Sequence, residues 1–293
     1  MELKKSNRSQ TRARIALQGP SGSGKTYSSL LLAYGICKDW KKIAVIDTEC
    51  GSSNLYSHLG DYNVLTLNAP FTPERYIEAI DACERSGMDV LILDSLSQEW
   101  EGSGGILDIH SQMVGNSFTN WAKLTPKHNA MIQRILQSGK HIIATVRSKQ
   151  DYVLSEKNGK STPEKIGLKG IQKDGYEFEF TTVFELDINN NISCTKDRTE
   201  IFKSQTTFKI DQTTGEKIMK WCKEAEPHSK AEAEALIDNC GSIDELNNLY
   251  RQTPFIREYV QLFNNKAYYL RLQRDAVNKI NRIQNGKQEK QHQ

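Results

Sequence analysis

Residues 19–26 of this chain read G-P-S-G-S-G-K-T, and their types and spacing are those that bind a polyphosphate. Glycines let the backbone curl so that its N–H groups point inward at phosphate oxygens, and a following helix adds the positive end of its dipole. Lys25 is placed to reach the β- and γ-phosphates, and the Thr26 hydroxyl to bind Mg²⁺. The motif therefore predicts a site for ATP and Mg²⁺, with contacts from Gly19, Pro20, Ser21, Gly22, Ser23, Gly24, Lys25, Thr26 and Tyr27.

Carboxylates at the ends of two apolar segments complete the chemistry that this motif requires. The run V-L-I-L-D-S places Asp94 at the end of a strand, where it is expected to hold Mg²⁺. The run I-A-V-I-D-T-E places Asp47 and Glu49 at the end of another. Since open α/β sheets bind ligands at the carboxyl edge, Glu49 is expected to orient and deprotonate the attacking water. An exposed acid near a strand end is the simpler alternative.

The elements that position these residues are predicted to be alternating strands and helices. Apolar strand-like runs occupy 15–18, 43–47, 64–67, 90–94 and 141–146, and helical patterns occupy 27–37, 73–86 and 122–138. Such alternation favours a parallel sheet with crossover helices. The expected fold class is therefore α/β, a mostly parallel twisted sheet flanked by helices.

The second half of the chain differs from the first in composition and periodicity. Residues 148–174 are rich in Lys, Gly, Ser and Asp with little periodicity, which predicts a long mobile loop. Strand patterns return at 176–187 and 192–195, and 206–210 is expected to close the sheet. Helices are expected at 230–239, 243–251 and 256–282, with Ser242 as an N-cap. The predicted organisation is a basic arm (1–12), an ATPase core (13–225) and a helical C-terminal domain with a basic tail (226–293).

Composition excludes several classes of protein. No apolar run approaches the roughly 20 residues of a membrane-spanning helix, and the N-terminus lacks the apolar segment of a secretory signal. Six scattered cysteines without metal-ligand spacing fit reduced thiols in the cytoplasm. A net charge of +3 is weak evidence for a nucleic-acid partner, although both termini are locally basic. Solvated tails are the alternative interpretation of those arms.

The combination of a phosphate loop, an I-D-x-E second strand and a D-S third strand resembles the core of RecA-type recombinases and RadA-like ATPases, over about residues 13–220. The resemblance implies that Glu49 is the catalytic base. The run T-K-D-R-T at 195–199 is similar to the K-x-R motif of RadA and replicative hexameric helicases. That similarity implies that Lys196 and Arg198 reach across a subunit interface to the neighbour's γ-phosphate. Without it, a solvated strand end explains them equally well.

The same resemblance assigns a nucleotide sensor and a DNA-binding loop. In that architecture the run I-I-A-T-V-R-S-K ends beside the γ-phosphate, so Thr145 or Arg147 is expected to sense the nucleotide. RecA carries a glutamine near this point, and here only Gln150 lies nearby. The following loop contacts single-stranded DNA in RecA-like proteins, because lysines neutralise phosphates and an aromatic ring stacks on a base. A disordered basic loop is the alternative. The expected contacts are Lys149, Tyr152, Lys157, Lys160, Lys165, Lys169 and Lys173.

As a whole the chain resembles phage-encoded RecA-like ATPases of single-strand annealing and recombination (Sak-type). The resemblance implies a homo-oligomer, ring or filament, with ATP at its subunit interfaces and single-stranded DNA as its ligand. It also suggests a single-strand-binding or annealing protein as a partner, and a location in the cytoplasm of a bacterium or an infected host. A ring-type helicase or translocase, and an ATP-controlled assembly switch without DNA, are the two alternatives.

Overall fold

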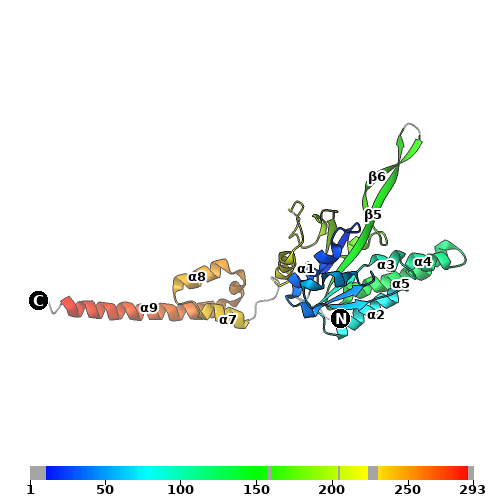
Figure 1. Cartoon of the computed structure of the whole chain (residues 1–293). Coiled ribbons are helices and arrows are strands. Elements are labelled where there is room, and N and C mark those ends of the chain that lie inside the picture. Colours follow the sequence, from blue (N-terminus) through cyan, green and yellow to red (C-terminus); the bar gives the residue numbers. More distant parts are fainter. Residues whose placement is uncertain (1–10, 158–159, 204, 224–229, 290–293) are drawn as a thin grey trace. The chain divides into compact units, whose positions relative to one another are not determined.

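The computed structural model describes residues 11–157, 160–203, 205–223 and 230–289, and it confirms the expected α/β architecture (Figure 1). The main sheet has the order β3-β2-β4-β5-β1-β7-β8, in which β8 is antiparallel to β7 and the other neighbours are parallel. Crossovers between non-consecutive strands bring the carboxyl ends of β1, β2, β4 and β5 to one edge. The strand bounds are β1 Arg14–Gly19, β2 Ile43–Asp47, β3 Asn63–Thr66, β4 Val90–Asp94, β5 His141–Lys157, β7 Thr182–Leu186 and β8 Ile192–Asp197.

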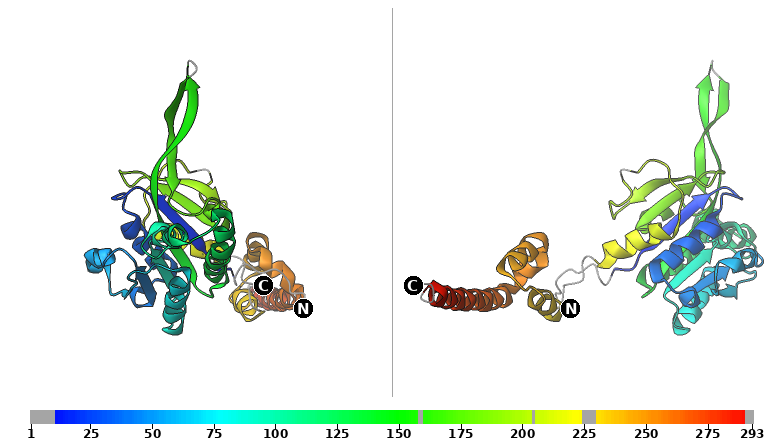
Figure 2. Two further views of the ribbon diagram at one scale, coloured as in Figure 1. Left: turned by 90° about the vertical axis from the view of Figure 1, so that its right-hand side faces the viewer. Right: turned by 60° about the vertical axis from the view of Figure 1, so that its left-hand side comes forward.

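Helices cover both faces of this sheet because its central strands are apolar on both sides. Ile43 and Val45 of β2 pack with α1 (Lys25–Cys37) and α6 (Gln212–Lys223), whereas Ala44 and Ile46 pack with α2 (Pro73–Arg85) and α5 (Ser117–Gln137). In Figure 2, α6 (yellow) lies alongside α1 (blue). Buried parallel strands read as continuous hydrophobic runs for this reason. The predicted strands 43–47 and 90–94 are confirmed at both ends.

Short elements carry the chain between the strands of the sheet. They are η2 (Trp40–Lys42), η3 (Ser52–Leu59), α3 (Ser97–Glu101), α4 (Ile106–Gln112) and η4 (Tyr176–Glu179). Trp100 and Trp121 stack on each other between α3 and α5, with ring centroids 5.9 Å apart. The β4–α3 segment therefore starts in the centre of the sheet and is anchored against α5.

A second compact unit follows α6 in the sequence. It contains α7 (Lys230–Asp238), α8 (Ile243–Gln252), η5 (Pro254–Tyr259) and α9 (Val260–Glu289). Its buried residues include Ile237, Leu246 and Leu270. The Ser242 hydroxyl accepts a hydrogen bond from the Glu245 backbone N–H, so the predicted N-cap is confirmed.

The prediction of a loop over 148–174 is wrong. In the structure β5 continues past the sheet and pairs with β6 (Lys160–Gly170) in an antiparallel β-ribbon, which rises from the core in Figure 1. Backbone hydrogen bonds between the two strands carry the pairing, and a composition rich in Lys, Gly, Ser and Asp, which are not typical strand residues, gave no strand signal.

Two further strand predictions need correction. The segment expected at 206–210 is not a strand but makes an isolated bridge from Phe208 to Ile192, and the Phe208 ring packs with Phe184 and Phe202. The strand expected from residue 176 begins only at Thr182, because Gly175 adopts a left-handed conformation and starts a 3₁₀ turn. None of the helices in the described ranges has the length and hydrophobicity needed to cross a membrane.

Candidate nucleotide site

The phosphate loop joins β1 to α1 with the geometry of an anion cradle. Gly22 and Gly24 have φ angles of 80° and 78°, in the left-handed region of the backbone that glycine adopts most readily. A Cβ atom on Gly24 would also lie only 2.6 Å from the side-chain amide nitrogen of Asn190. Lys25 is buried, and its Nζ donates to the carbonyl oxygens of Gly19 (3.0 Å) and Pro20 (2.8 Å). Burial lowers the pKa of Lys25. The amine therefore lies in the cradle on neutral acceptors that phosphate oxygens can replace.

Two hydroxyl groups hold the carboxylate predicted to bind Mg²⁺. Asp94, 1% exposed at the end of β4, accepts hydrogen bonds from Thr26 Oγ1 on Oδ2 (2.7 Å) and from Thr145 Oγ1 on Oδ1 (2.5 Å). Burial raises the pKa of Asp94, and the two hydroxyl groups oppose that rise. Thr145 thus contacts the carboxylate directly, a role that the sequence did not indicate.

The residues present fit a magnesium–nucleotide complex. In the described part of the chain, no group of three or more His, Cys, Asp or Glu residues is arranged to hold a metal by itself. Mg²⁺ is commonly bound through one or two protein groups, with substrate phosphates and waters supplying the other ligands. Thr26 and Asp94 are adjacent oxygen donors beside the cradle, which matches that mode.

The loop after β2 is organised by Asp47 and presents Glu49. Asp47 is fully buried, and its Oδ1 accepts from the backbone N–H of Glu49 (2.8 Å) and of Gly51 (3.2 Å). Its Oδ2 accepts from the Ser53 backbone N–H (2.9 Å). Asp47 is therefore structural, and it fixes the backbone that carries the Glu49 side chain.

Glu49 forms an ion pair with Arg147. Arg147 Nε donates to Glu49 Oε1 at 2.8 Å, and this contact is the first cause of a raised pKa of Arg147. Both residues line one cavity of about 200 Å³ together with Lys25, Thr26 and Asp94. The structure thus brings the cradle, the metal-binding candidates, the candidate base and the candidate sensor Arg147 to one place.

The cavity has an aromatic and apolar rim that sequence reasoning missed. Ser52, Leu55 and Tyr56 of η3 line it, and the Tyr56 ring lies edge-on to Tyr27 at 5.6 Å. Tyr27 itself is exposed and does not line the cavity. Tyr56 follows Glu49 closely in the sequence, so the chain between them is too short to carry Tyr56 far from the site. This spacing was the signal available in the sequence.

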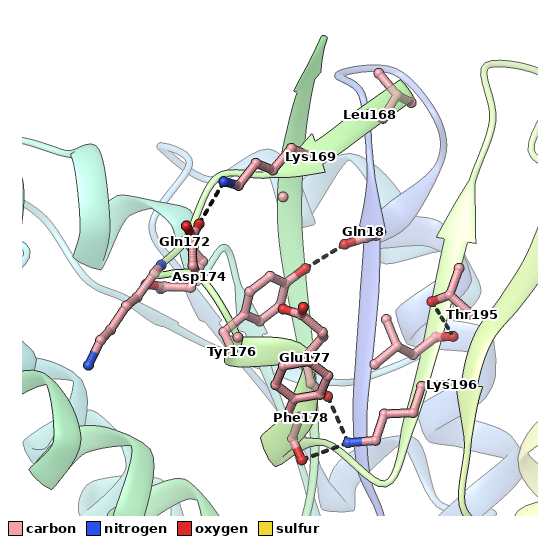
Figure 3. Close-up of a pocket in the computed structure, with 14 residues that line it drawn as sticks. Gln18, Leu168, Lys169, Gln172, Asp174, Tyr176, Glu177, Phe178, Thr195 and Lys196 are labelled. Atoms are coloured by element: carbon pink, nitrogen blue, oxygen red, sulfur yellow. Dashed lines mark hydrogen bonds and ion pairs between the residues drawn. The ribbon is translucent and has the colours of Figure 1, made fainter. Parts of the chain in front are cut away.

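Lys196 and Arg198 do not line this cavity. Lys196 Nζ donates to the carbonyl oxygens of Glu177 (2.9 Å) and Phe178 (2.6 Å), and Arg198 Nη2 donates to that of Phe178 (3.1 Å). Lys196 lines a separate cavity of about 570 Å³ between β8 and the base of the ribbon (Figure 3). Burial and the neighbouring Arg198 lower the pKa of Lys196.

The residues expected to bind DNA belong to the β5–β6 ribbon and its exit. Lys149 is exposed, Lys169 pairs with Asp174 at 2.7 Å, and Lys173 Nζ donates to Asn129 at 3.3 Å. The side chains of Gln150, Tyr152, Lys157, Lys160 and Lys165 lie outside the described residues, as does most of the basic N-terminal arm.

Comparison with known proteins supports an ATPase of this kind. Residues 11–216 match a family model described as "AAA domain". A protein named "Protein RecA" from Wigglesworthia glossinidia brevipalpis is 36% identical over 102 residues, which is 33% of this chain and 31% of that protein. The matched segment thus spans about a third of the length of this relative.

Proposed function

This chain belongs to the AAA-domain family of P-loop ATPases, and from that premise we propose that it hydrolyses ATP and uses the reaction to control binding to single-stranded DNA. The observation that carries the proposal is the position of Arg147. Its side chain lines the phosphate cavity, and its backbone lies in the strand that continues as the ribbon.

Five residues of the cavity have distinct roles in this reaction. Lys25 leaves the two loop carbonyls for oxygens of the β- and γ-phosphates. Thr26 and Asp94 hold Mg²⁺, which neutralises charge on the phosphate oxygens. Glu49 accepts a proton from the water that attacks the γ-phosphorus. Since Arg147 engages Glu49 in the isolated chain, we infer that Arg147 turns to the γ-phosphate and frees the carboxylate.

Lys196 and Arg198 act, in this proposal, on the nucleotide of a neighbouring copy. Both cations converge on the carbonyl oxygen of Phe178, and no carboxylate in the described ranges forms an ion pair with either. Converging cations held only by neutral acceptors are suited to an added anion. The proposed assembly is a homo-oligomer in which one copy supplies the cradle and the next supplies these two charges.

The β5–β6 ribbon is the proposed DNA-binding element. The similarity to a protein named RecA supports a recombination function, and the lysines of the ribbon support contacts with phosphates. We propose that the oligomer promotes annealing of single strands, as in phage-encoded Sak-type ATPases, together with a single-strand-binding or annealing protein. Such an assembly acts in the cytoplasm.

Three assays on the wild type and Lys25→Ala test this function. We expect ATP hydrolysis by the wild type to rise with an unpaired oligonucleotide, and Lys25→Ala to be inactive with or without it. Complementary oligonucleotides should anneal faster in the presence of the wild-type protein, without unwinding of a forked duplex. Unwinding would instead indicate a motor. If unpaired DNA neither binds nor accelerates hydrolysis, the DNA-dependent part of the proposal is wrong and an assembly switch is favoured.

A further inference from the structure

A buried polar cluster lies under the point where the β5–β6 ribbon returns to the core. Glu99 of α3, His128 of α5 and Gln172, two residues after β6, are each at most 4% exposed. His128 Nδ1 lies 3.0 Å from Glu99 Oε1, and Gln172 Nε2 donates to Glu99 Oε2 at 3.2 Å. None of the three lines the phosphate cavity, so the proposed chemistry does not use them.

Gln172 also connects the ribbon to the segment that directly follows Asp94. Its Nε2 donates to the Leu96 carbonyl oxygen at 3.1 Å, and the Leu96 N–H donates to the carbonyl oxygen of Thr145 at 2.9 Å. Thr145 in turn donates through Oγ1 to Asp94 at 2.5 Å. A continuous set of hydrogen bonds therefore runs from the exit of β6 to the candidate metal-binding carboxylate. Figure 3 shows Gln172 at the base of the ribbon.

The other strand of the ribbon, β5, is hydrogen-bonded to the same segment after Asp94. The Arg147 backbone N–H donates to Ser97 Oγ at 2.9 Å, and the Arg147 carbonyl oxygen accepts from the Ile171 N–H at 2.7 Å. The entry and the exit of the ribbon are thus joined to each other and to the first turns after Asp94. A displacement of the ribbon must move this segment or break these bonds.

The Glu99 carboxylate makes breaking them costly. A buried carboxylate is tolerated only where polar partners compensate for its lost hydration; here Gln172 Nε2 donates to it, and His128 Nδ1 lies within hydrogen-bond distance. Removing Gln172 from the cluster would leave the buried Glu99 Oε2 without this hydrogen-bond donor. The cluster therefore favours movement of the ribbon and the β4–α3 segment as one body over their separation.

We propose that Gln172 is the positioning residue that couples the β5–β6 ribbon to the nucleotide site. A ligand bound to the ribbon then changes the position of Thr145 and Asp94, and nucleotide at that site changes the ribbon's affinity for the ligand by the same factor. The identity of the ligand, single-stranded DNA, rests on the proposed function. The coupling itself rests on the contacts above.

The test compares Gln172→Met, which keeps the length of the side chain and removes the donor, with Gln98→Met. Gln98 is half-buried on α3, and no hydrogen bond from its side chain to the ribbon is found among the described residues. For Gln172→Met we expect ATP hydrolysis without DNA, and DNA binding without nucleotide, within about twofold of wild type. Stimulation of hydrolysis by DNA should fall about tenfold, as should the effect of a non-hydrolysable ATP analogue on DNA affinity. Gln98→Met should behave as wild type.

The proposal would be overturned if DNA stimulated hydrolysis by a folded Gln172→Met protein as strongly as it does for the wild type. It would also be overturned if hydrolysis without DNA fell by the same factor as the stimulation. If Gln172→Met does not fold, Gln172→Asn carries the same test, because its shorter amide withdraws from Leu96 and Glu99. Hydrogen exchange of the β6 amides with and without the analogue separates this proposal from the DNA function. If wild-type β6 amides do not respond to the analogue, the coupling is wrong, whether or not DNA binds.

Discussion

Thr145 offers the sharpest test of how Asp94 is held. The Thr145 side chain is fully buried and donates to Asp94 Oδ1 at 2.5 Å, so Thr145→Val keeps its shape and removes a donor to a buried carboxylate. A hydrogen bond to a charged group contributes roughly 1.5–3 kcal/mol. We therefore expect the free energy of unfolding of the nucleotide-free protein to fall by about 2 kcal/mol at pH 8. For a domain of this size that lowers the thermal midpoint by about 4–8 °C.

The effect of Thr145→Val should depend on pH. Burial raises the pKa of Asp94, and the Thr145 hydrogen bond opposes that rise, so the variant raises the pKa further. A protonated Asp94 has no charge for Thr145 to stabilise, and the loss of stability should therefore shrink as the pH falls. For the same reason, the acid limb of the magnesium-dependent ATPase profile should move to higher pH.

Urea unfolding at pH 8 and pH 5, and ATPase rates across the same range, measure both effects. Thr145→Ser keeps the hydroxyl group and serves as the control for loss of the methyl group. A Thr145→Val protein that is as stable as Thr145→Ser at pH 8, with an unmoved acid limb, would refute the role of Thr145 in holding Asp94.

Three further predictions concern the base, the core and the pH dependence of folding. Glu49→Gln should slow hydrolysis by about 10²- to 10⁴-fold with ATP binding retained, measured by turnover and nucleotide titration; normal turnover would exclude Glu49 as the base. Gly35→Ala should lower stability by about 1–3 kcal/mol in urea unfolding, because its Cβ would overlap the α6 backbone, whereas Gly139→Ala, in open space, should not. Burial and nearby arginines lower the pKa of His141 from 6.5 to about 4. The unfolded chain therefore takes up that proton first, and stability should fall by about 2 kcal/mol more in wild type than in His141→Gln between pH 6.5 and pH 5.

The sequence predicted best those features that depend on local pattern. The strands at 43–47 and 90–94 are buried on both faces, so each reads as a continuous apolar run that ends at a functional carboxylate. The phosphate loop was equally readable, because its glycines meet a local backbone requirement. These segments account for the correct fold class and for the position of the cradle.

Features that depend on strand order were not visible in the sequence. Thr145 meets Asp94 only because β5 lies beside β4, and Arg147 meets Glu49 from two strands away. Gln172 was assigned to a mobile loop, since nothing in a Lys- and Gly-rich tract marks one amide as buried. The neighbouring Ile171, an apolar residue at the end of this tract, was a local sign that the chain re-enters the core there.

Mixing two inactive variants tests most directly whether hydrolysis occurs at sites shared between copies. Lys25→Ala damages the cradle, and Arg198→Ala damages the charge supplied to a neighbour. In an equal mixture, half of the cradles and half of the arginines are intact, so we expect about a quarter of wild-type ATPase activity (½ × ½) from two proteins that are each inactive. A mixture no more active than its components, or an Arg198→Ala protein that hydrolyses ATP at the wild-type rate, would contradict a shared site.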